Sequence, residues 1–275
     1  MNNDSIPSPG LDPAGAPFPP GPVASAAPVS NHRQLIAPVW HTALIVLVML
    51  GQSVVSALVA SKAIRGSLAV SEKARILQYV STIVLEFVFL FLVWVGLRLR
   101  RTRIRDVIGG RWETPESVIL DVALGVGVCI ATYFLLLLLS YLVGLAKPGQ
   151  LEDTKRLAGL LAPHTVIGLL IFIGLSATAG FVEEVIFRGY LQKQIGALSG
   201  NAYVGLFASA LVFGAAHGYE GLRRMLLIFI LGLIFGFVVL WRKSLRPTMF
   251  AHAFFDSAQG VLLFLVTKYG LLDGK

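Results

Sequence analysis

The sequence has 275 residues, of which 56% are hydrophobic and only 14% are charged. Soluble domains are about 45–50% apolar and about 25% charged, so this chain has too few charged side chains to cover a water-facing surface of ordinary size. The composition argues against a soluble enzyme and against a disordered scaffold, and it favours a multi-pass membrane protein.

The amino-terminal segment, residues 1–38, differs from the rest of the chain. It contains nine of the 13 prolines, and its only charged side chains are Asp4, Asp12 and Arg33. A segment of this composition cannot bury enough apolar surface to offset the entropy lost on ordering. We therefore expect a disordered tail rich in Pro, Gly and Ala.

Seven apolar runs follow the tail, separated by short polar segments. About 20 apolar residues span a bilayer core of roughly 30 Å as a helix. The runs predict an all-α fold, a polytopic transmembrane helical bundle of seven spans, or eight if one run is split. They comprise residues 39–60, 76–97, 117–146, 165–182, 201–216, 225–241 and 248–267.

The net charge of +8 would suggest a nucleic-acid partner in a soluble protein. Most aromatic residues lie inside the apolar runs, however, so we predict no nucleic-acid binding. Excess Lys and Arg in a membrane protein is typical of cytoplasmic loops beside anionic lipid. The densest basic segments, which we therefore place in the cytoplasm together with the amino terminus, are residues 98–111 and 241–246.

Charged side chains are costly inside a bilayer, so each one at membrane depth is a candidate functional residue. The amino-terminal half offers one in mid-span, Glu86, which has no acid or histidine near it in sequence. For this isolated residue we favour a role in helix packing over a direct functional role.

The carboxy-terminal half carries three polar clusters on separate apolar runs. In the first, Glu184 and Arg188 stand four residues apart, so they share one face of a helix and can form an ion pair. Glu183 points about 100° away around the axis and stays free for chemistry. The second cluster is Phe213-x-x-x-His217, and the third is His252-x-x-x-Asp256.

Each cluster alone is compatible with a structural role, either an ion pair at a helix end or a polar pair between helices. Together they place two glutamates, an arginine, two histidines and an aspartate at membrane depth. Gathering these groups around one water-filled cavity costs less free energy than exposing each of them to lipid. Carboxylates and imidazoles so placed can activate water for hydrolysis.

These three motifs, in this order, resemble the CPBP family of intramembrane proteases, which includes CAAX prenyl endoproteases and bacteriocin-processing or abortive-infection proteins. The resemblance covers about residues 165–267 and includes the run Phe187-Arg188-Gly189-Tyr190-Leu191. It implies a catalytic transmembrane domain at residues 161–270. Residues 39–160 form the amino-terminal transmembrane helices and carry no matching motif.

The resemblance also implies roles for the site residues. Glu183 is the general base that activates water, and Glu184 orients a histidine or the base. Arg188 holds this arrangement, and His217 positions the water or a metal ion. Members of the family are named metalloproteases, but a glutamate mechanism without a metal has also been proposed for them, and this sequence allows either.

The third motif departs from the commonest family pattern at one position, because Asp256 stands where Asn is commoner. Asn can donate a hydrogen bond to an oxyanion, whereas ionised Asp only accepts. His252 and Asp256 are expected to stabilise the tetrahedral intermediate or to hold a metal. Two histidines and a glutamate form a credible zinc set, so Glu183, His217 and His252 are candidate ligands of Zn²⁺.

The rival predictions are a proton-coupled transporter and a non-catalytic membrane immunity or scaffold protein. Transporters often carry broken helices in two repeated halves, whereas the polar clusters here occupy one half, which favours an enzyme. The expected partners are the lipid bilayer and a membrane-associated peptide or protein, such as a prenylated CAAX-type or leader-peptide substrate. We expect a multi-pass protein of the bacterial plasma membrane, and we predict no oligomeric state.

If each apolar run crosses the membrane as one straight helix, the three motifs do not all meet at the same depth. Such helices put Glu183, Glu184 and His252 towards the cytoplasmic side, whereas His217 lies 16 residues into its run, about 24 Å along a helix. A short tilted helix, a start of that helix inside the membrane, or an extra re-entrant segment after Ser199 would bring the motifs together.

Overall fold

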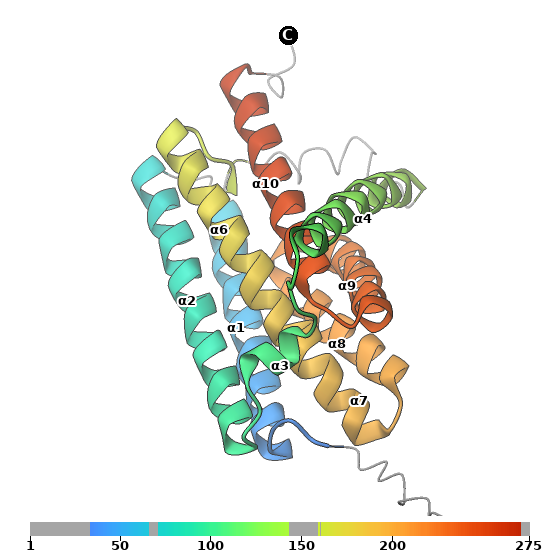
Figure 1. Ribbon diagram of the computed structural model, residues 1–275. Coiled ribbons are helices and arrows are strands. Elements are labelled where there is room, and N and C mark those ends of the chain that lie inside the picture. The colour runs from blue at the N-terminus through green and yellow to red at the C-terminus, as the bar shows by residue number, and fades with distance from the viewer. Residues whose placement is uncertain (1–33, 66–70, 143–158, 160, 271–275) are drawn as a thin grey trace, which may run out of the picture. The chain divides into compact units, whose positions relative to one another are not determined.

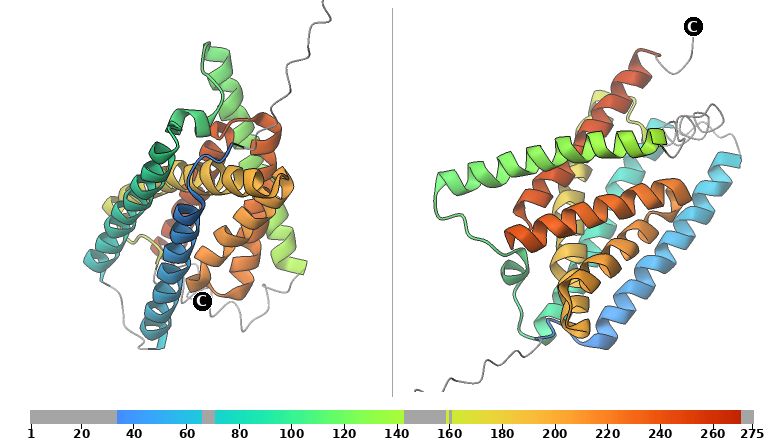
Figure 2. Two further views of the ribbon diagram at one scale, coloured as in Figure 1. Left: turned by 90° about the horizontal axis from the view of Figure 1, so that it is seen from below. Right: turned by 90° about the vertical axis from the view of Figure 1, so that its right-hand side faces the viewer.

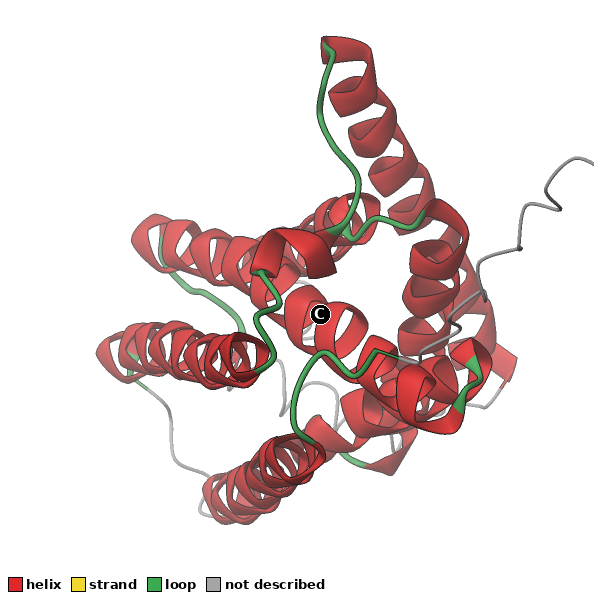
Figure 3. Cartoon of the chain, turned by 60° about the horizontal axis from the view of Figure 1, so that its bottom comes forward, coloured by secondary structure: helices red, strands yellow, loops and turns green. Residues whose placement is uncertain are grey.

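A computed structural model describes residues 34–65, 71–142, 159 and 161–270. Helices and short loops make up this part of the chain, and the described residues contain no extended strand (Figures 1 and 3). The predicted all-α class is therefore confirmed. Most of the predicted tail, residues 1–33, and the end of the third predicted span, residues 143–146, lie outside the described residues.

The first half of the chain supplies three long helices and one short helix, and the second half supplies the remainder. These elements are α1 (Val39–Arg65), α2 (Glu72–Leu99), α3 (Ile104–Ile108), α4 (Pro115–Leu142), α6 (Val166–Glu184), η1 (Val185–Gln192), α7 (Lys193–Ser199), α8 (Ala202–Ala216), η2 (Gly218–Glu220), α9 (Leu222–Arg242) and α10 (Arg246–Lys268).

Six helices of the described part are long and apolar enough to cross a membrane. The prediction of a multi-pass membrane protein agrees with this count, but the fifth predicted span does not reach the required length. It forms α8, which has only 15 residues. A helix of that length rises about 22 Å, which is short of a bilayer core of roughly 30 Å.

The fourth predicted span is longer than its apolar run suggests. The helix does not end near Val182 but continues as the π-helix η1 and then as α7, so that one helical rod covers Val166–Ser199. Its 34 residues extend about 50 Å at the helical rise. Glu183 and Glu184 therefore lie in the middle of the rod and not at its end, which corrects their predicted position.

A tight turn reverses the chain after this rod. Gly200 has a left-handed backbone with φ of 70°, and the Asn201 side chain caps α8 by accepting a hydrogen bond from the Tyr203 backbone N–H at 2.9 Å. α8 then runs back along α7 and η1. Because α8 has nearly the length of the segment it retraces, its last residues return to the level of Glu184. This reversal resolves the geometric difficulty with His217.

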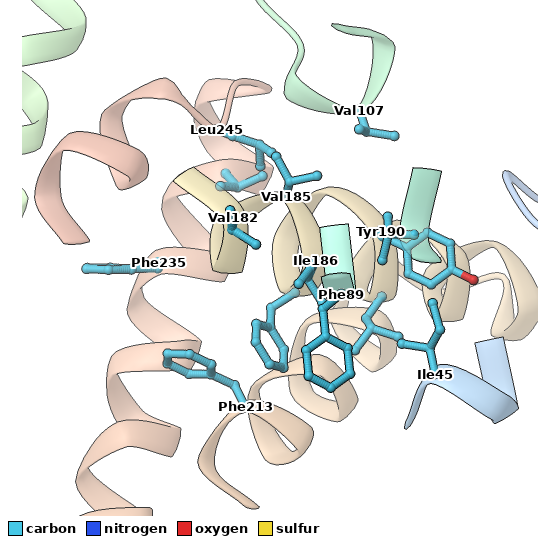
Figure 4. Close-up of a cluster of buried hydrophobic side chains, with 14 of the residues drawn as sticks. Ile45, Phe89, Val107, Val182, Val185, Ile186, Tyr190, Phe213, Phe235 and Leu245 are labelled. Carbon is cyan, nitrogen blue, oxygen red and sulfur yellow. The ribbon is translucent and has the colours of Figure 1, made fainter. Parts of the chain in front are cut away.

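The centre of the structure is built around η1, whose eight residues are all buried. Apolar side chains from the surrounding helices pack on it, including Phe89 of α2 and Phe213 of α8 (Figure 4). The rings of Phe187 and Phe213 lie edge to face with centroids 4.8 Å apart. In contrast, α1, α2 and α4 expose many large apolar side chains, as helices that face lipid do.

α4 packs across the outer side of α10 and α9 (Figure 2). One ion pair fastens it there, since Arg242 of α9 contacts the buried Asp121 at 3.0 Å. The two basic segments also meet, because the Leu245 backbone N–H donates to the Ile108 carbonyl at 2.8 Å and Arg246 donates to the Gly109 carbonyl at 2.7 Å. They therefore lie on one side of the bundle, as the orientation prediction requires.

Candidate active site

Close packing of α6 against α10 brings the first and third motifs together. Gly180 of α6 lies directly on the α10 backbone, where an added Cβ atom would come within 2.8 Å of the Ala253 nitrogen and the Met249 oxygen. Only a residue without a side chain permits this approach. The next turn of α6 carries Glu183 and Glu184, which therefore face His252 on α10.

Glu184 forms the innermost part of the site. Its Oε1 atom accepts a hydrogen bond from Arg188 Nη1 at 2.8 Å and a second from His252 Nδ1 at 3.1 Å. The side chains of all three residues are almost completely buried. The predicted pairing of Glu184 with Arg188 is present, and Glu184 contacts the histidine that it was expected to orient.

Two aromatic rings complete the environment of the arginine. The Arg188 guanidinium carbon lies 4.3 Å from the Phe213 ring centroid and 5.4 Å from that of Phe235. A cation stacked on ring faces gains electrostatic stabilisation, particularly where water is excluded. Phe213 thus supports the arginine from the second motif, while Phe235 on α9 was not singled out by any sequence pattern.

Glu183 and Asp256 lie on the other side of the His252 ring. The Nε2 atom is 3.7 Å from Glu183 Oε2 and 3.6 Å from Asp256 Oδ2. These contacts are longer than direct hydrogen bonds, and water commonly bridges polar atoms at such separations. Glu183 Oε2 is buried and has no hydrogen-bond partner among the described residues. The free carboxylate predicted at Glu183 is thus next to the imidazole.

His217 approaches the site from the end of α8. Its Nδ1 atom is 2.9 Å from the Phe213 carbonyl oxygen, which can only accept, so Nδ1 carries the hydrogen. The Nε2 atom of a neutral ring is then left as an acceptor. No direct contact joins His217 to a carboxylate of the described residues, but His217 interacts electrostatically with Asp256, and its ring lies 4.9 Å from that of Phe213.

The turn after His217 adds two groups that sequence reasoning missed. The Tyr219 ring lies 6.1 Å from that of His217, and the tyrosine interacts electrostatically with Glu220, Glu183 and Asp256. Burial raises the pKa of Tyr219 well above its usual value, so its hydroxyl group keeps its proton and can donate a hydrogen bond. No local motif marks these residues, because only the short helix η2 turns them towards the acids.

The fit to a metal ion is poor. Among the described residues, no three His, Cys, Asp or Glu side chains are arranged to hold a metal. The hydrogen bonds at Nδ1 of His252 and His217 leave Nε2 of both rings free, as in metal-ligating histidines, but no direct contact joins His217 to Glu183. The structure does not show Glu183, His217 and His252 gathered as a ligand set, so zinc binding by these residues stays a prediction, and the proposed reaction is derived without a metal.

The fold and the site together define a multi-pass membrane protein with an acid–histidine centre at membrane depth. Residues 164–258 match the family model described as type II CAAX prenyl endopeptidase Rce1-like. The match confirms, for this part of the chain, the resemblance to the CPBP family, and it contains all six predicted site residues. No curated protein and no solved structure matches the chain.

Proposed function

We propose that this protein is an intramembrane endopeptidase that hydrolyses a peptide bond with water activated by Glu183. The arrangement of groups around His252 carries the proposal. One ring nitrogen is fixed by the buried pair of Glu184 and Arg188, while the other faces the carboxylates of Glu183 and Asp256. A fixed imidazole beside a free carboxylate is the composition that hydrolytic sites use for general acid–base chemistry.

The first chemical step follows from the unpaired oxygen of Glu183. The carboxylate accepts a proton from a bound water, and the resulting hydroxide attacks the carbonyl carbon of the scissile bond. The carbonyl oxygen becomes an oxyanion in the tetrahedral intermediate. The Tyr219 hydroxyl group is a donor for this charge, and the imidazoles of His252 and His217 donate from Nε2 when that nitrogen carries a proton.

The second step releases the products. The intermediate collapses, the C–N bond breaks, and Glu183 returns its proton to the leaving amine. The carboxylate is thereby regenerated, and one water molecule has been consumed for each bond that is cleaved. Glu184 and Arg188 take no part in proton transfer, and they hold His252 in place throughout the cycle.

The position of the site supports a membrane-associated substrate. Glu183 and Glu184 lie halfway along a rod that is longer than the bilayer core is thick. A lipid-anchored peptide can reach such a site from the membrane, and the family match supports a CAAX-type prenylated substrate, with a leader peptide as the alternative. We place the protein in the bacterial plasma membrane.

Purified protein in liposomes, supplied with fluorogenic farnesylated peptides and membrane-anchored leader-peptide fusions, tests the proposal. We expect cleavage by the wild type and losses of at least about 100-fold in His217→Ala and His252→Ala. His164→Ala, which alters an exposed histidine at the start of α6, is the matched control and should keep full activity. Equal activity in all four preparations, or proton-coupled solute flux without cleavage, would overturn the proposal.

A further inference from the structure

Glu86 is a buried carboxyl group that the proposed mechanism does not use. It lies in the middle of α2, is 8% exposed, and its Oε2 atom has no hydrogen-bond partner among the described residues. The sequence suggested a packing role for this residue. A buried carboxyl that lacks a partner destabilises a helix bundle, however, and an apolar side chain of similar size would pack at lower cost.

The surroundings of Glu86 are the candidate active site. The residue interacts electrostatically with Glu183, His252 and Asp256. α2 packs against α6 and η1, and Phe89, one turn further along α2, belongs to the apolar cluster that also holds Phe213 (Figure 4). The helix therefore passes the site at the level of the two glutamates, and it adds a further carboxyl group to those of Glu183, Glu184 and Asp256.

The polar atoms around this point form one set. Glu183 Oε2 and Glu86 Oε2 are both buried without a partner, and His252 Nε2 contacts carboxylates only at 3.6 and 3.7 Å. Buried polar groups of native proteins are nearly always hydrogen-bonded to protein or to ordered water, and a buried water needs two to four such partners. The three atoms supply the number of partners that one buried water needs.

We propose that Glu86 is a positioning residue for the hydrolytic water. Its carboxyl oxygen accepts one O–H of the water while Glu183 accepts the other, which turns an oxygen lone pair towards the scissile carbonyl. The inference rests on the proposed function and extends it to a helix outside the family match, which begins at residue 164. On this proposal α2, one of the amino-terminal helices, contributes a residue to the active site.

Two substitutions separate positioning from packing. Glu86→Leu removes the acceptor and fills the same space with an apolar group, so we expect kcat to fall about 10- to 100-fold, KM to stay within about twofold, and Tm to remain equal or rise. Glu86→Gln keeps an oxygen acceptor and should stay within about fivefold of the wild-type kcat. Ser81→Ala, which changes an exposed polar residue on the same helix, is the control and should alter neither value.

The substitutions are made in the full chain and assayed on the farnesylated and leader-peptide probes, with Glu183→Gln in parallel. Full activity of Glu86→Leu beside an inactive Glu183→Gln overturns this inference alone. Equal losses in Glu86→Leu and Glu86→Gln also overturn it, because a positioning acceptor is rescued by the amide oxygen. An active Glu183→Gln overturns the proposed function itself.

Discussion

Gly180 offers the sharpest test of how the helix packing positions the site. In Gly180→Ala, the added Cβ atom would lie 2.8 Å from two backbone atoms of α10, whereas ordinary van der Waals contact begins at 3.4 Å. Because backbone cannot rotate away as a side chain can, α6 and α10 must separate by about 0.6 Å. The hydrogen bond between Glu184 and His252, now 3.1 Å, would then lengthen to about 3.7 Å and be lost.

Two effects on the variant are expected. Overpacking of this kind costs about 1–3 kcal/mol of folding stability, and a displacement approaching 1 Å in a catalytic group lowers turnover by about 10- to 100-fold. Tm in detergent and kcat on the peptide probes measure them. Gly174→Ala, on the same helix with nothing within 4 Å of the added atom, is the control and should gain up to about 1 kcal/mol from helix propensity. Identical behaviour of the two variants would refute the reasoning.

Three further predictions follow from the same contacts. Arg188→Met leaves the Glu184 charge buried without its partner, so the free energy of unfolding should fall by about 3–5 kcal/mol in denaturant titration. A loss below about 1 kcal/mol would show that the ion pair is not essential for stability. Asp256→Asn keeps the shape of the side chain and adds a donor, so kcat should stay within about threefold or rise, and a hundredfold loss would show that the carboxylate is required. Metal chelation should leave the cleavage rate unchanged within about twofold, since the described donors form no ligand set; loss of activity that added zinc restores would contradict this.

The candidate site was predictable because its motifs are local. Spacings of four residues place Glu184 with Arg188, and His252 with Asp256, on shared helix faces whatever the rest of the fold does. The structure has both pairings within ion-pair distance. The presence of several ionisable residues in apolar runs indicated that they gather, since each would be costly alone in lipid.

The length of the central rod was not predictable from the apolar pattern. Polar residues after Glu184 suggest the end of a span, yet Gln192 and Gln194 are buried and form hydrogen bonds with distant parts of the chain. Gln192 donates to the Gly236 carbonyl at 3.0 Å, and Gln194 donates to the Ala37 carbonyl at 2.7 Å. Tertiary hydrogen bonds of this kind leave no periodic signal in the sequence, so the helix seemed to stop where it continues.

The proximity of Glu86 to the candidate site could not be predicted for the same reason. In sequence it stands almost 100 residues from the next acid of the site, and only the packing of α2 on α6 and η1 brings it near Glu183 and His252. The position of Tyr219 beside His217 also required the structure, because the short turn after His217 creates this contact. Local chemistry was therefore predictable from the sequence, whereas contributions from other helices required the structure.

Cleavage by Glu183→Gln tests the central claim most directly. The amide keeps the size of the side chain but cannot take a proton from water, so kcat on the membrane-anchored peptide probe should fall by about 10²- to 10⁴-fold. The affinity of the variant for the uncleaved peptide, measured in the same liposomes, should stay within about twofold of that of the wild type. A Glu183→Gln variant that cleaves the peptide at the wild-type rate would contradict the assignment of Glu183 as the base.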